Sequence, residues 1–153
     1  MHQYGQAKRL ENVISELGLE GTLHIAQLHS LAEVRCVADR LESWMRVHGY
    51  QWKDIFAVKL VLHEAAANAI RHGNRRDPAK CVRIRFLVTP AEVLVAVEDE
   101  GEGFDLERVG TNLTEEFQDR PGNRGLLLIR AYSTWVTFDP PGNRVTMCRR
   151  RSV

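Results

Sequence analysis

Three polar side chains recur at intervals of four residues in an otherwise apolar stretch, LVLHEAAANAIRHGN, which spans residues 60–74. They are Glu64, Asn68 and His72. An α-helix turns about 100° per residue, so side chains four apart lie next to each other on one face. Because an unpaired carboxylate or amide is costly to bury, this row must meet water, a neighbour such as Arg71, or a ligand.

Two glycine-containing segments could complete a ligand site with this row. In the first, Asp99, Gly101 and Gly103 form a D-x-G-x-G pattern directly after an apolar stretch that is typical of a strand. A carboxylate at a strand end can accept a hydrogen bond from an exocyclic amine, and the glycines let a flat ring approach the backbone. A tight acidic turn exposed to water is the alternative interpretation.

The second segment, residues 122–129, has the sequence GNRGLLLI and leads into an apolar helix. The free N–H groups at a helix start favour a phosphate, and Arg124 would add a charge-assisted contact. A simple junction between a loop and a helix would also explain the pattern. Neither a G-x-x-x-x-G-K-[ST] phosphate loop nor an H-E-x-x-H zinc motif is present, since Ala67 stands where the second histidine would be.

The composition is that of one globular domain. The 153 residues are 44% hydrophobic and 27% charged, with a formal net charge of +1, which favours neither nucleic acid nor a membrane surface as a partner. The three cysteines show no C-x-x-C spacing, and the N-terminus lacks the apolar core of a signal peptide. These features indicate a cytoplasmic protein with reduced thiols. The basic run CRRRSV at residues 148–153 is interpreted as a solvated tail or a strand end.

The hydrophobic periodicity predicts an α+β fold, a two-layer sandwich with helices on one face of a mixed, mostly antiparallel sheet. An amphipathic helix over residues 6–17 precedes the main pattern, so we expect an N-terminal helical extension over 1–21 and one domain over 22–153. Residues 100–123 form a long loop, which is interpreted as a lid. The expected strands are 22–28, 82–89, 93–98, 135–138 and 145–149, and the expected helices of the domain are 31–48, 52–72 and 125–132.

Together these motifs resemble those of the Bergerat-fold ATPases of the histidine-kinase type, and more narrowly those of the anti-sigma-factor serine/threonine kinases. HEAAANAIRHG is similar to their N-box, EDEGEGFD to their first glycine box, and NRGLLLIRAY to their second. The resemblance covers about residues 22–150. One departure is Leu127, which stands where the family often has the second glycine of G-L-G-L.

The resemblance implies a site for ATP and Mg²⁺. It assigns Asn68 to the metal on the ATP phosphates and Glu64 to the base that accepts the proton of a substrate hydroxyl. Asp99 would bind the adenine amine. The other nucleotide contacts it implies are Gly101 and Gly103 around the base, Arg124, Gly125 and Leu126 beside the phosphates, and His72, whose role is left open.

The resemblance further implies an ATP-dependent serine/threonine protein kinase of a bacterial partner-switching system. Such a protein acts as an anti-sigma factor and phosphorylates a small STAS-type antagonist protein, and we expect it to be a homodimer. Two alternatives stay open. One is a nucleotide-binding regulator that sequesters a sigma factor or another partner without catalysis. The other is an adaptor domain that has lost nucleotide binding, for which Leu127 would be the reason.

Overall fold

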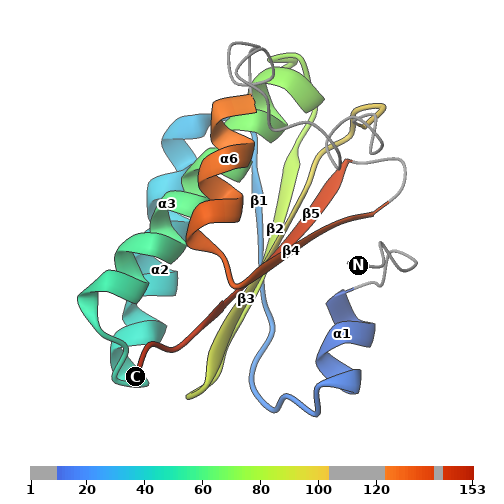
Figure 1. The fold of residues 1–153 in the computed structure, drawn as a ribbon. Coiled ribbons are helices and arrows are strands. Elements are labelled where there is room, and N and C mark those ends of the chain that lie inside the picture. Colours follow the sequence, from blue (N-terminus) through green and yellow to red (C-terminus); the bar gives the residue numbers. More distant parts are fainter. Residues whose placement is uncertain (1–9, 104–122, 140–142) are drawn as a thin grey trace.

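A computed structural model describes residues 10–103, 123–139 and 143–153 (Figure 1). The elements follow the predicted order, with one short helix in front and one π-helical turn after the longest helix. In chain order they are α1 (Leu10–Glu16), β1 (His24–Leu28), η1 (Leu31–Glu33), α2 (Val34–Val47), α3 (Trp52–Asn68), η2 (Ala69–Gly73), β2 (Val82–Val88), β3 (Glu92–Glu98), α6 (Asn123–Tyr132), β4 (Trp135–Asp139) and β5 (Arg144–Arg150).

The five strands form one sheet in the order β1-β2-β3-β5-β4. All four pairings among the described residues are antiparallel, so the mixed sheet that was expected is antiparallel throughout this part of the chain. Alternate side chains of a strand point to opposite faces, and the register keeps each face consistent. Phe86, for example, pairs with Val95, and Val95 pairs with Met147.

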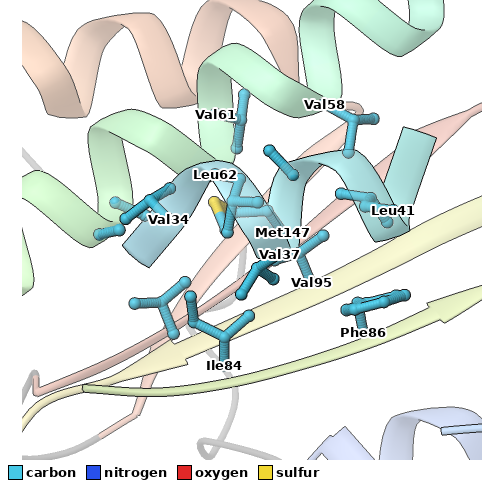
Figure 2. Close-up of a cluster of buried hydrophobic side chains, with 14 of the residues drawn as sticks. Val34, Val37, Leu41, Val58, Val61, Leu62, Ile84, Phe86, Val95 and Met147 are labelled. Carbon is cyan, nitrogen blue, oxygen red and sulfur yellow. The ribbon is translucent and has the colours of Figure 1, made fainter. Parts of the chain in front are cut away.

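Three helices cover one face of this sheet. Figure 1 shows α2, α3 and α6 side by side on that face. The buried stripe of α2 recurs at helical spacing, and Gly49, at a φ of +76°, ends the helix as predicted. Figure 2 shows the shared core between α2, α3 and the sheet, which includes Val37, Leu41, Val61, Leu62, Ile84, Phe86, Val95 and Met147. Burial of each such side chain contributes roughly 1.5–3 kcal/mol to folding.

The opposite face carries a second, smaller core under α1 (Figure 1). Leu10 is only 1% exposed and packs with Leu87, Leu94 and Cys148, which alternate with the residues of the first core. An ion pair between Glu11 and Arg85 holds the helix from its side. The helices of the predicted domain lie on one face, whereas α1, which belongs to the expected N-terminal extension, covers the other, because the outward side of the central strands is apolar. Residues 6–9 of the predicted N-terminal helix lie outside the described part.

The basic C-terminal run is partly a strand end, as predicted, and partly a structural clamp. Arg149 forms an ion pair with Asp54, a fully buried residue on the first turn of α3. The distance from Arg149 Nε to Asp54 Oδ1 is 3.0 Å. Ser152 donates both its N–H and its hydroxyl to the same carboxylate. Arg151 donates to the carbonyls of His48 and Gly49 at the end of α2. Within the described ranges, no helix combines the length and apolar character needed to cross a membrane.

Candidate functional site

The C-terminal half of α3 meets the first turn of α6 at Gly125. A Cβ atom on Gly125 would lie 2.9 Å from Glu64 Oε2 and 3.0 Å from Asn68 Nδ2. Only glycine lets α6 come this close to both side chains without displacing one of them. The structure thus brings together Glu64, Asn68 and Gly125, which were predicted from two separate motifs.

Asn68 is the buried polar residue of this group. It is 9% exposed, and its Nδ2 atom has no hydrogen-bond partner among the residues that the structure describes. A buried donor without a partner costs about 1–3 kcal/mol, which is a reason to look for a ligand at this position. An asparagine amide can also rotate and present its oxygen in the same place, and oxygen is the ligand atom that Mg²⁺ prefers.

The regular α-helix that carries Glu64 and Asn68 ends before His72. The α-helix ends at Asn68, and the next five residues form the π-helical turn η2, which the N–H of Asn74 closes on Ala69 O at 2.8 Å. His72 is exposed, while Glu64 is half-buried and Asn68 is buried.

The acidic turn packs directly on this π-helical turn. Asp99 is 7% exposed, and its carboxylate lies so close to Gly73 that any Cβ there would overlap both carboxylate oxygens. Gly101 is restricted in the same way by Gly73 O, and its N–H donates to Asp99 Oδ1 at 2.7 Å. Burial raises the pKa of Asp99 above its ordinary value, and the hydrogen bond from Gly101 opposes this shift in part. The carboxylate is therefore held in one orientation in a poorly solvated place.

A small pocket that is partly open to solvent has both Asp99 and Asn68 in its lining. Its walls are mostly apolar, with three polar residues among them, as in many small-molecule sites. An apolar cleft with a fixed acceptor at one end suits a flat ring that carries an amine. The lining residues are Ala65, Asn68, Ala69, Val97, Asp99, Leu126, Ile129, Phe138, Asn143 and Val145.

The other predicted residues take varied positions. Leu126 is 3% exposed and lines the pocket, whereas Arg124 is exposed on the first turn of α6. Gly103 is exposed and has a φ of +89°, a conformation that favours glycine. Residues 104–122 of the predicted lid lie outside the described part of the chain.

Sequence reasoning missed several residues of the site. Asn143 lines the pocket and exchanges backbone and side-chain hydrogen bonds with Asp99, although it lies in a Pro-Pro-Gly-Asn turn that indicates only a reversal of the chain. Phe138 and Val145 belong to strands and look like ordinary core residues. Gly73 is the one missed residue that the sequence signals. A glycine at the end of a polar row can end the helix, and it can also let another segment, here Asp99, approach the backbone closely.

No group of three or more histidine, cysteine, aspartate or glutamate side chains that could hold a metal occurs among the described residues. A metal held by Asn68 would take further oxygen ligands from the bound ligand and from water. This is a common arrangement for Mg²⁺ bound with a nucleotide, because Mg²⁺ usually keeps several waters and binds substrate phosphates.

Comparisons with known proteins agree with this fold. The family model of the histidine kinase-like ATPase domain matches residues 28–149, which include α2, α3, α6 and the strands β2 to β5 except Arg150, but only Leu28 of β1. The chain therefore belongs to the histidine kinase-like ATPase domain family.

Three individual relatives with sequence similarity to this chain carry the same name. The serine-protein kinase RsbW of Bacillus subtilis (strain 168) is 37% identical over 60 residues, which are 39% of this chain and 38% of that protein. The RsbW of Bacillus licheniformis is 34% identical over 58 residues, 38% of this chain and 36% of that protein. The RsbW of Staphylococcus aureus is 28% identical over 109 residues, 66% of this chain and 69% of that protein. The matches thus span little more than a third of the two Bacillus proteins.

Proposed function

We propose that this chain binds ATP with Mg²⁺ and is a serine/threonine protein kinase of a bacterial partner-switching system. In this proposal it is a cytoplasmic homodimer that acts as an anti-sigma factor and phosphorylates a small STAS-type antagonist protein. The observation that carries the proposal is a pocket lined by both Asp99 and Asn68, together with the close approach of Gly125 to Asn68 and Glu64. The RsbW relatives support the kinase class.

Asp99 selects the base in this proposal. Its carboxylate accepts a hydrogen bond from the exocyclic amine of adenine, and the apolar walls around Val97, Ile129 and Phe138 hold the ring. A base that presents a carbonyl oxygen at the same position would place two acceptors against each other. Base discrimination therefore follows from an acceptor that is buried and fixed.

Asn68 holds the metal. The fit rests on its buried amide, which has an unpaired atom, and on Gly125, which leaves the space beside that amide free of a Cβ. When bound, Mg²⁺ neutralises charge on the phosphates during phosphoryl transfer. The first turn of α6 has free N–H groups that can bind a phosphate, and Arg124 belongs to the same turn.

Glu64 accepts the proton from the substrate hydroxyl. It lies one helical turn before Asn68 and is half-buried, so its carboxylate is partly open to a substrate at the surface. A general base must come within hydrogen-bond distance of the hydroxyl, and its place next to the metal ligand meets that need.

The test is a Glu64→Gln variant, which keeps the size of the side chain and removes the base. We expect ATP affinity to stay within about threefold and phosphoryl transfer from labelled ATP to the cognate antagonist to fall by about 100-fold or more. His63→Gln, an exposed neighbour on the same helix, is the matched control and should keep both properties. Unchanged transfer by the Glu64 variant would refute the role of Glu64.

Leu127 favours a second candidate, a nucleotide-binding regulator without catalysis. Its half-buried side chain stands in the second turn of α6, where the family that the sequence resembles often has glycine, and a side chain in place of glycine would leave less room for phosphates there. This candidate predicts saturable Mg-ATP binding with no phosphoprotein in the same transfer assay. Absence of saturable binding would instead leave only an adaptor role.

A further inference from the structure

Asn74 is a buried amide that the nucleotide site as described above does not use. It follows η2, is 2% exposed, and both ends of its side chain are bonded. Nδ2 donates to the carbonyl of Cys81 at 2.9 Å, and Oδ1 accepts the N–H of Glu100 at 2.8 Å. Asn74 therefore connects the end of the α3 segment with the acidic turn after β3.

The bond to Glu100 acts on Asp99 through the backbone. Glu100 N belongs to the peptide that directly follows Asp99, so anchoring it restricts the direction in which the Asp99 side chain points. The next N–H, of Gly101, donates to Asp99 Oδ1 and sets the rotation of the carboxylate. On the other side, Asn143 accepts the N–H of Asp99 at 2.9 Å and donates Nδ2 to its carbonyl at 3.0 Å. Asp99 is thus held from both sides by amides.

The backbone after Asn74 is strained. Arg75 and Arg76 have φ values of +51° and +59°, in the left-handed region that residues with a side chain rarely adopt. Both arginine side chains are exposed, so packing of these side chains does not explain the conformation. The turn instead reverses the chain so that Asn74 points inward, and Arg76 N–H returns to Ile70 O at 2.9 Å. Strain of this kind persists where the surrounding structure requires one geometry.

We infer that Asn74 is a positioning residue for nucleotide recognition, which sets the Asp99 carboxylate relative to Asn68 on α3. The inference rests on the proposed binding of ATP and concerns the adenine end of the same site. It differs from the simpler role of a helix stop, because a helix stop would stabilise the fold without changing which base is preferred.

The experiment compares two nucleotides on the full chain. Dissociation constants are measured with Mg²⁺ for ATP and for purine riboside triphosphate, which lacks the exocyclic amine, using wild type, Asn74→Ala and the exposed control Asn12→Ala. For Asn74→Ala we expect ATP binding to weaken about tenfold and purine riboside triphosphate binding to change by less than about twofold. Asn12→Ala should match wild type for both nucleotides.

A double-mutant cycle with Asp99→Asn separates action through Asp99 from a direct effect. If Asn74 acts through Asp99, adding Asn74→Ala to the Asp99 variant should change ATP affinity by less than about twofold. Should Asn74→Ala fail to fold, Asn74→Ser fills part of the space with a hydroxyl that is one bond shorter, and the same result is expected.

The outcomes are distinct. Equal weakening of both nucleotides, or an unchanged preference for ATP, would overturn the positioning role while leaving ATP binding by wild type intact. Wild type that binds neither nucleotide would overturn the proposed function and this inference with it.

Discussion

Replacing Asp99 with asparagine should weaken nucleotide binding while leaving the free protein at least as stable as wild type. The substitution keeps the volume of the side chain and an oxygen that can accept the Gly101 N–H, now 2.7 Å from Oδ1. It removes the negative charge and places an NH₂ group where the second oxygen lies. The adenine amine then meets a donor in place of an acceptor.

The size of the loss follows from the type of bond. A hydrogen bond to a charged group contributes about 1.5–3 kcal/mol, which corresponds to roughly a 10- to 150-fold change in the dissociation constant. Asp99 is only 7% exposed, so water does not readily replace the lost contact. We expect a loss in the upper part of that range.

The effect on stability has the opposite sign. Burial raises the pKa of Asp99 above its ordinary value, so the folded state retains a proton that the unfolded chain releases near pH 4. Wild type therefore loses stability as the pH rises from about 4 through the raised pKa, and asparagine does not titrate. The melting temperature of the variant relative to wild type should increase over that interval.

Isothermal titration with Mg-ATP and thermal unfolding between pH 4 and 7 measure the two effects. An ATP affinity within about threefold of wild type would refute the assignment of Asp99 to the adenine amine. A variant that is less stable than wild type by more than about 1 kcal/mol at pH 7 would refute the argument that the buried charge destabilises the free protein.

Two other substitutions test separate parts of the structure. Asn68→Ala should abolish the Mg²⁺-dependent part of ATP affinity, which titrations with and without the metal measure. It should change the free energy of unfolding by less than about 1 kcal/mol, because the loss of packing is offset by removal of the buried, unpaired Nδ2 atom. Arg151→Ala removes two hydrogen bonds to the end of α2 and a guanidinium group that lies 5.5 Å from the ring centre of Tyr50. The free energy of unfolding should therefore fall by about 1–3 kcal/mol, which a lower melting temperature would show. Arg150→Ala, whose side chain is 67% exposed, should change the melting temperature by about 1 °C or less.

The local periodicity of apolar residues was enough to predict most of the helices and strands. The sequence pattern predicted helices where α2 and α3 lie and strands where β2 and β3 lie. For the same reason the pairing of Glu64 with Asn68 followed from their spacing alone. The fold class was confirmed because these signals are local and mutually consistent.

Features that depend on distant contacts could not be read in this way. The π-helical turn that holds His72 is closed at Asn74, whose partners Cys81 and Glu100 come later in the chain. The basic C-terminal run looks like a surface tail until the buried Asp54 is placed beside it. Whether α1 lies on the helical or the open face is likewise set by Leu87 and Leu94, which only the paired sheet brings together.

Because α1 covers the core that contains Cys148, labelling of this cysteine can report the movement of α1 away from the sheet. Its thiol is 1% exposed in the core that α1 covers, and burial raises its pKa far above the ordinary value, so a maleimide cannot react with it in the closed state. Cys36 is exposed on α2 and Cys81 is half-buried, so both should react before Cys148, and a Cys81→Ser background removes the overlap between Cys81 and Cys148. The slow phase of labelling therefore measures how often α1 leaves the sheet, which gives the opening free energy of one helix without unfolding the rest.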